Sequence, residues 1–376
     1  MKRLAQLPAF VLIVILSTSC IGTIEQQPAE TLASAYNDHF YIGAALKTSQ
    51  YTGEDQRGIP IVEKHFNSIS PENDLKWERI HPEPGVFNFE EADSFVEFGE
   101  ANDMFIVGHV LVWHSQTPDW VFEDEDGNPL SREALLERME DHITTIVTRY
   151  KGRINGWDVV NEALNEDGTF RESKWYQIIG PDFIAKAFEY AAAADPEAEL
   201  YYNDYNLFNP DKADGAIQMV KDIQEQGIKV SGIGMQGHYG LQGPTAEEVE
   251  ASIIKFGELG IVAITELDVD VLPPAFEYMG ADISMRAELK EELNPYTEGM
   301  PDSIKQAQID QYTAYFEVFL KHADKINRVT TWGVTDGDSW KNYWPVSERR
   351  NYPLLFDREG NEKEVAKVLM ELPSNK

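Results

Sequence analysis

The sequence predicts a single (β/α)₈ TIM barrel, and three observations lead to this fold class. Short apolar, β-branched segments alternate with longer amphipathic segments along the chain, a pattern that favours a parallel sheet with crossover helices. Eight strand-like segments can be counted, which is the number that closes such a barrel. Polar and aromatic clusters follow seven of them, as expected when the carboxyl ends of the strands meet at one mouth.

The order of elements follows directly from these patterns. We expect strands at residues 41–46, 68–70, 105–110, 156–161, 199–202, 232–236, 262–266 and 330–333. Helical patterns lie between them at residues 90–101, 132–150, 175–194, 211–226, 246–259 and 304–322. Ser131, Asp211 and Thr245 are expected N-caps, because their side-chain oxygens can accept hydrogen bonds from the free N–H groups of a first helical turn.

Length and composition agree with one large folded domain. The chain has 376 residues, of which 42% are hydrophobic and 11% aromatic, while a barrel of this class takes about 250 residues or more. No linker or break in composition divides residues 37–374. The formal charge of −33 repels phosphate backbones and anionic lipid surfaces, so we expect no nucleic acid partner.

The first 36 residues differ from the rest. A basic start and the apolar run of residues 10–16 precede Cys20, the single cysteine, which is the pattern of an export signal. We expect residues 1–19 to be a signal peptide, Cys20 to be the lipidated residue of a lipoprotein, and residues 20–36 to be a tether. Ser17 stands where the usual lipoprotein pattern has leucine, and a plain secretory signal is the alternative. Without a second cysteine, no internal disulfide can form.

Two stretches carry the strongest chemical signal. Residues 157–163 (WDVVNEA) and 264–269 (ITELDV) are apolar, β-branched runs that end in polar residues, and each contains one glutamate, Glu162 or Glu266. Buried parallel strands have this pattern where they emerge into a site. Two carboxylates that folding brings together are required for acid/base and nucleophilic chemistry at an acetal carbon. The pair therefore predicts a retaining glycoside hydrolase.

The motifs around these glutamates resemble glycoside hydrolase family 10. They are SPEN (70–73), KW (76–77), GH (108–109), LVWHSQ (111–116), WDVVNEA (157–163), YNDYN (202–206), GMQGH (234–238), TELD (265–268), WGVTD (332–336) and SW (339–340). Family members are endo-β-1,4-xylanases on a (β/α)₈ barrel, and the motifs extend over residues 43–357. The resemblance implies that residues 37–374 form the catalytic barrel, with Glu162 as acid/base and Glu266 as nucleophile.

The resemblance also implies supporting roles around the pair. Glu266 must be ionised and Glu162 protonated when substrate binds. His238 is the expected hydrogen-bond donor to Glu266, with Asp268 orienting it, and Asn161 is expected to bind the sugar 2-hydroxyl. Gln236 is expected to steady the nucleophile.

Nine further residues are implied to bind substrate. For Lys76, an ion pair with Glu72 or Glu78 is the structural alternative, and core packing is the alternative for any tryptophan. A bulky tryptophan over the −1 site would leave no room for the hydroxymethyl group that glucose has and xylose lacks, so shape would favour xylan. The expected substrate-binding residues are Glu72, Asn73, Lys76, His109, Trp113, Gln116, Tyr205, Trp332 and Trp340.

Other features are assigned no chemical role. We expect no cofactor and no metal, since the histidines lack a His-Glu-x-x-His spacing and residues 123–128 lack the full ligand pattern of a calcium loop. Those residues are expected to form a solvated turn. Residues 272–302 would either border the substrate cleft or decorate the periphery.

Two other functions stay open, namely hydrolysis of another β-linked glycan and non-catalytic glycan binding by a surface lipoprotein. We expect a monomer that binds xylan and xylo-oligosaccharides. It would be exported to the cell surface or periplasm and would touch the membrane only through the lipid on Cys20, or else be secreted.

Overall fold

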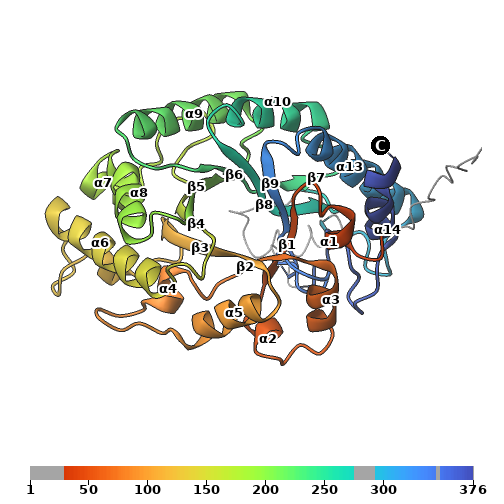
Figure 1. The fold of residues 1–376 in the computed structure, drawn as a ribbon, viewed down its shortest axis with the longest axis horizontal. Helices are drawn as coiled ribbons and strands as arrows, with labels where there is room; N and C mark the ends of the chain where they lie inside the picture. The colour runs from red at the N-terminus through yellow and green to blue at the C-terminus, as the bar shows by residue number, and fades with distance from the viewer. Residues whose placement is uncertain (1–28, 275–292, 344–347, 376) are drawn as a thin grey trace, which may run out of the picture.

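The computed structural model describes residues 29–274, 293–343 and 348–375. Eight parallel strands close into a barrel in the order β1-β2-β3-β4-β5-β6-β8-β9, and β9 pairs back onto β1. The helices surround this ring in Figure 1. The predicted fold class is therefore confirmed. The strands are β1 (Tyr41–Leu46), β2 (Ser68–Pro71), β3 (Phe105–Trp113), β4 (Gly156–Asn161), β5 (Glu199–Asp204), β6 (Gly232–Met235), β8 (Ile261–Asp270) and β9 (Ile326–Thr331).

The expected position of the last strand was wrong by several residues. We expected residues 330–333, whereas β9 begins at Ile326. Asn327 and Arg328 interrupt the apolar run that marks a buried strand. Arg328 is nevertheless 1% exposed, because its guanidinium lies 3.7 Å from the buried Asp158 carboxylate and over the ring of Tyr201.

One predicted helix is two helices. The pattern over residues 175–194 divides into α7 and α8 because Gly180 adopts φ 98°, a conformation that glycine adopts without steric cost, and Pro181 follows it. The described helices are α1 (Leu32–Ala35), α2 (Thr48–Tyr51), α3 (Gly58–His65), α4 (Trp77–Ile80), α5 (Glu90–Ala101), α6 (Arg132–Arg149), α7 (Lys174–Ile179), α8 (Phe183–Ala194), α9 (Pro210–Glu225), α10 (Ala246–Phe256), α13 (Asp302–Lys321) and α14 (Glu364–Glu371), with short 3₁₀ turns at Asp119–Val121 and Leu372–Asn375.

Two of the three predicted helix N-caps are present in the structure. Ser131 and Thr245 accept from the backbone N–H groups of Ala134 and Glu248, so both predicted caps are confirmed. Asp211 was wrong as a cap, because Asn209 caps α9 and Pro210 occupies its first turn. Proline suits that position since its missing N–H would have had no partner in the helix.

The segment expected to be a tether is partly folded. Within residues 20–36, α1 packs against α3 and α14 (Figure 1), and Leu32 and Tyr36 are fully buried. The Tyr36 hydroxyl donates to the Leu369 carbonyl oxygen at 2.8 Å. The packed barrel therefore begins about where α1 begins, before the expected boundary at residue 37. Cys20 and residues 275–292 of the long 272–302 segment lie outside the described residues.

Close packing between neighbouring strands explains one glycine of the motifs. A Cβ added to Gly108 on β3 would clash with the indole of Trp157 on β4, and Trp157 is 1% exposed. The absent side chain therefore leaves the space that the indole occupies. Among the described helices, none is both long and apolar enough to cross a membrane.

Candidate active site

A short extra strand positions the first of the two glutamates. β7 (His238–Gly240) pairs in parallel with the end of β8 beyond the barrel, with His238 opposite Asp268. Because side chains alternate along a strand, Glu266 and Asp268 of β8 both face His238. Its imidazole bridges them, with Nδ1 3.0 Å from Asp268 Oδ2 and Nε2 3.1 Å from Glu266 Oε2. Both predicted contacts of His238 are present.

Charge interactions among His238, Asp268 and Glu266 determine the protonation of these three side chains. Burial disfavours protonation of His238, but the Asp268 charge and the hydrogen bonds to both carboxylates outweigh it and raise the pKa of His238 to about 9. Burial also opposes ionisation of Glu266, yet the donors around it, His238 first, leave the pKa of Glu266 below its ordinary value. Glu266 is 5% exposed and is thus a buried, ionised carboxylate.

The second glutamate is held differently. Glu162 follows β4 and adopts φ 57°, a left-handed conformation that is costly for a residue with a side chain. The flanking peptide groups support it. The Glu162 N–H donates to the Asn203 carbonyl at 2.9 Å, and its own carbonyl accepts from Arg171 Nε at 2.9 Å. The strained turn re-aims the side chain where the strand ends, and the side chain is partly exposed.

One amide network joins the two glutamates. Asn203 Nδ2 donates to Glu266 Oε1 at 2.8 Å and to Asn161 Oδ1 at 3.0 Å. Gln236 Nε2 lies 3.2 Å from the same Asn161 oxygen and 3.1 Å from Glu162 Oε1. Glu266 and Glu162 therefore lie at opposite ends of a continuous set of hydrogen bonds from β4, β5, β6 and β8.

This network corrects the expectation for Gln236. Its side chain contacts Glu162 and not Glu266, and only its backbone carbonyl reaches the nucleophile, accepting from the Glu266 N–H at 2.7 Å. Asn161, expected to bind sugar, uses its Oδ1 to accept from Asn203 and Gln236 and places Nδ2 3.3 Å from Glu162 Oε1.

A second cluster lies beside the glutamates, after β2 and β3. Lys76 Nζ donates to Asn73 Oδ1 at 3.1 Å and to Gln116 Oε1 at 2.8 Å, and it lies 5.1 Å from the ring centroid of Trp113. Within the described part of the chain, Lys76 forms no ion pair with Glu72 or Glu78, so that alternative was wrong. Burial lowers the pKa of Lys76 against the opposing charges of Glu266, Glu72 and Glu162.

Two further polar members of the cluster are the partly exposed Glu72 and the buried His109. Burial raises the pKa of Glu72 despite the nearby ammonium groups of Lys47 and Lys76. His109 is 2% exposed, and its Nδ1 lies 2.9 Å from Asp158 Oδ2. That contact occupies Nδ1, so Nε2 is the ring nitrogen of His109 that can bind a substrate hydroxyl.

Aromatic rings line the same mouth. Trp332 packs edge-on against His109 and His238 at centroid distances of 5.2 and 6.4 Å. Trp340 packs against His238 at 5.1 Å, and its indole N–H donates to Asp268 Oδ2 at 3.2 Å. Both tryptophans of the loop after β9 thus flank the histidine that holds Glu266. The Tyr205 hydroxyl accepts from Arg171 at 2.8 Å.

Three residues of the site were missed by the sequence analysis as functional residues. Asn203 lies within a quoted motif but had no assigned role, and it is fully buried against Glu266. Lys341 follows Trp340, and its Nζ lies 2.6 Å from Asp268 Oδ1. Arg171 supports the Glu162 carbonyl. A buried polar residue at a strand end signals Asn203, whereas no sequence pattern indicates the other two.

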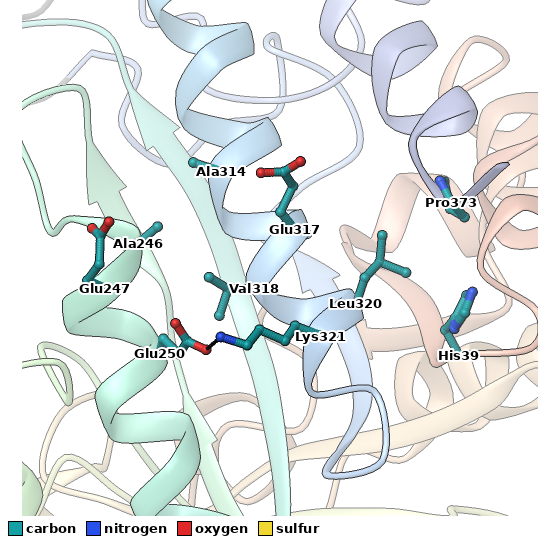
Figure 2. A pocket seen from close by; sticks show the side chains of 10 residues that line it. All are labelled: His39, Ala246, Glu247, Glu250, Ala314, Glu317, Val318, Leu320, Lys321 and Pro373. Carbon is teal, nitrogen blue, oxygen red and sulfur yellow. Dashed lines mark ion pairs between the residues drawn. The ribbon is translucent and has the colours of Figure 1, made fainter. Parts of the chain in front are cut away.

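An exposed turn and a groove outside the barrel contain none of the predicted site residues. Residues 123–128 form an exposed turn closed by hydrogen bonds to Asp124 Oδ1, and among the described residues no group of three or more His, Cys, Asp or Glu is placed to hold a metal ion. A groove of about 640 Å³ lies outside the barrel between α10 and α13 (Figure 2), where Glu250 pairs with Lys321 at 2.7 Å. None of the predicted site residues lines this groove.

Comparison with known proteins gives one consistent answer. The model of glycosyl hydrolase family 10 matches residues 31–372. The endo-1,4-β-xylanase A of Xylanibacter ruminicola is 44% identical over 349 residues, which are 93% of this chain and 94% of the relative. The endo-1,4-β-xylanase of Geobacillus stearothermophilus is 41% identical, over 89% of this chain and 96% of the relative.

Solved structures are similar over the same extent. A GH10 endoxylanase retrieved from a sugarcane soil metagenome superposes with a TM-score of 0.86 at 44% identity, covering 92% of this chain and all of the other. A Paenibacillus barcinonensis xylanase complexed with a conduramine derivative gives 0.83 at 36% identity, over 92% and 100% of the two chains.

Proposed function

The chain belongs to glycosyl hydrolase family 10, and we propose that it is an endo-1,4-β-xylanase that hydrolyses internal β-1,4 bonds of xylan with retention of configuration. The observation that carries the proposal is the contrast between Glu266, a buried carboxylate with donors on both oxygens, and Glu162, a partly exposed one. Retaining glycosidases use one ionised nucleophile and one acid.

In the first step Glu266 attacks the anomeric carbon and Glu162 protonates the departing oxygen. The donors from His238 and Asn203 keep Glu266 ionised in a buried site, which maintains it as a nucleophile. They also fix the direction of attack, since each carboxylate oxygen has one donor at 2.8–3.1 Å. A fixed carboxylate costs little reorganisation as the transition state forms.

In the second step Glu162 acts as base toward water. Formation of the glycosyl ester removes the negative charge of Glu266, and Glu162, which has given its proton to the leaving group, can accept one from the attacking water. Gln236 and Asn161 hold Glu162 Oε1 through both steps. Asn161 is placed between the two glutamates, where a bond to the sugar 2-hydroxyl would strengthen in the oxocarbenium-like transition state.

Shape and hydroxyl recognition select the sugar. Trp332 and Trp340 enclose the side of the site at His238, so a sugar with an exocyclic hydroxymethyl group would meet an indole there. The substrate-facing polar groups of Glu72, Asn73, Lys76, His109 and Gln116 match the hydroxyls of xylose in the glycone subsites, with Trp113 beside Lys76 and Tyr205 beside Arg171.

Product analysis tests this function. Purified protein should release xylo-oligosaccharides of mixed length from glucuronoxylan and arabinoxylan early in digestion, which is the mark of internal cleavage. Faster cleavage of carboxymethylcellulose than of xylan would instead indicate another β-glycan as substrate. Binding of xylan without any release of reducing sugar would indicate a glycan-binding protein.

We further propose that the protein is exported and anchored by a lipid on Cys20. The support is the order of basic, apolar and small residues up to Cys20. In a bacterial host, metabolic labelling with a fatty-acid analogue should label the wild type and not a Cys20→Ser variant. If neither protein is labelled and both are found in the medium, the segment is a plain secretory signal.

A further inference from the structure

A buried lysine contacts the last residue of β5, the strand that pairs with β4. Lys212 of α9 has a fully buried side chain. Its Nζ lies 3.0 Å from Asp204 Oδ1, 3.2 Å from Glu166 Oε1 and 3.5 Å from the ring centroid of Tyr205. Burying an ammonium is costly unless it is paired, so these partners and Lys212 must be positioned together.

Asp204 connects Lys212 to the backbone next to the acid/base through hydrogen bonds. Its Oδ2 accepts from the Tyr202 hydroxyl at 2.5 Å, and the Tyr202 oxygen in turn accepts from the backbone N–H of Ala163 at 3.1 Å. Tyr202 and Asp204 are fully buried. Ala163 directly follows Glu162, so a chain of three contacts connects the ammonium of Lys212 to the peptide bond of the acid/base.

A second route reaches the same turn through Tyr205. The Tyr205 N–H donates to Asp204 Oδ1 at 2.9 Å, and Lys212 covers one face of its ring. The Tyr205 hydroxyl accepts from Arg171, which also donates to the carbonyl of Glu162. Both routes therefore reach the same peptide group, between Glu162 and Ala163, which follows the strained φ 57° residue. Tyr202 accepts from its N–H, and Arg171, which donates to Tyr205, also donates to its carbonyl.

We propose that Lys212 is a positioning residue for protonation of the leaving group. It fixes Asp204, and through it the left-handed turn that aims the Glu162 carboxyl at the glycosidic oxygen. Burial raises the pKa of Asp204 to about 6 even with the ammonium beside it, so loss of Lys212 would favour the neutral carboxyl and weaken the acceptor for Tyr202. The proposal rests on the assignment of Glu162 as acid/base.

The test compares two aryl β-xylobiosides that differ only in the leaving group. A phenol leaving group needs protonation, whereas 2,4-dinitrophenol leaves without it. Lys212→Met should lower kcat/KM for the phenyl substrate about 10- to 100-fold, which is within the range of general acid catalysis. It should change kcat/KM for the dinitrophenyl substrate less than about 3-fold. Lys255→Met is the matched control, because that lysine pairs with Asp214 at the exposed surface, and it should change neither rate.

Tyr202→Phe is the second variant, since it removes only the hydroxyl that joins Asp204 to Ala163. It keeps the proposal testable if Lys212→Met does not fold, and it should show the same leaving-group selectivity. Equal losses on both substrates, or no loss on either, in a folded variant would overturn the proposal. Glu162→Ala separates the two claims. If it lacks the selective loss, the acid/base assignment fails, whereas a selective loss in Glu162→Ala alone overturns only the role of Lys212.

Discussion

The surroundings of the two glutamates differ in burial, in donors and in backbone strain. Glu266 is 5% exposed, lies within strand β8, and receives hydrogen bonds from His238 and Asn203 on its two oxygens. Glu162 is partly exposed, sits in a left-handed turn, and has amide groups of Gln236 and Asn161 on one oxygen only. The same side chain is thus placed in two environments.

The difference indicates how one residue type can serve two roles. A nucleophile must be ionised and must not move, which dense donors and burial provide. An acid/base must lose and regain one proton in each cycle, which requires access and one oxygen free of strong donors. The first environment depends on charges around β8, and the second depends on a strained turn after β4.

The largest expected effect comes from the nucleophile itself. Glu266→Ala should lower kcat by about 10⁵-fold or more, on the scale of losing a nucleophile in other enzymes, and the loss should be the same for good and poor leaving groups. Steady-state kinetics on the two aryl xylobiosides measures it. A residual rate that depended on the leaving group would suggest that the two roles are reversed.

Removing the Asn203 side chain, which connects the surroundings of Glu266 to those of Glu162, should have the next largest effect on kcat. Asn203→Ala takes one donor from Glu266 and one from Asn161, and we expect a loss of about 10²- to 10³-fold in kcat, comparable to losing one preorganised donor. Substrate binding should change less, so KM should stay within a few fold. A variant with unchanged kcat would show that His238 alone suffices.

A smaller effect is expected from the charge behind His238. Lys341 helps lower the pKa of Asp268 against burial, so removing the ammonium should raise the pKa of the carboxyl groups around His238. Because the ionised forms are active, Lys341→Met should move the acid limb of the kcat/KM profile to higher pH, by about one unit. The exposed Lys367 provides a control variant, Lys367→Met. A shift to lower pH would contradict this account of the nucleophile.

The smallest expected effect is on the pH dependence of folding stability, to which a buried histidine pair contributes. His81 and His142 form a buried pair with Nδ1 atoms 3.1 Å apart. Burial lowers the pKa of His81 to about 4 and that of His142 well below its ordinary value. The unfolded chain therefore binds these protons below about pH 6.5 and the folded chain does not, so stability falls as pH drops from 6.5 toward 4.

Replacing one member of the pair should reduce this slope. In His142→Phe, the free energy of unfolding should fall less steeply between pH 6.5 and 4, by up to about 1.4 kcal/mol per pH unit. Denaturant titrations at several pH values measure it, with exposed His39→Gln as the control. An unchanged slope would mean that the pair is protonated in the folded protein. The acid limb of activity should not move in either variant.

The sequence predicts the barrel and the positions of the reactive groups, because both depend on local patterns. Glu162, Glu266 and His238 stand at strand ends, and the closure of a parallel barrel brings strand ends together. The break between α7 and α8 was missed, although Gly180 and Pro181 stand at it. The start of β9 could not be predicted, because Arg328 is compatible with a buried strand only through partners on other strands.

The directions of individual side chains could not be predicted for the same reason. Gln236 follows β6, and its distance from each glutamate depends on the twist and register of three strands. Lys341 reaches Asp268 of β8 from the loop after the neighbouring strand β9. Asn203 serves Glu266 from a neighbouring strand. Such contacts depend on tertiary geometry, which no spacing within one segment encodes.

Covalent trapping tests the central claim most directly. A 2-deoxy-2-fluoro xylobioside with a good leaving group slows both steps, because fluorine destabilises the oxocarbenium-like transition state, and lets the glycosyl-enzyme accumulate. Peptide mass spectrometry of the inactivated protein should place the label on Glu266. A label on Glu162, or turnover with no covalent adduct and inverted product, would contradict the assignment of the two environments.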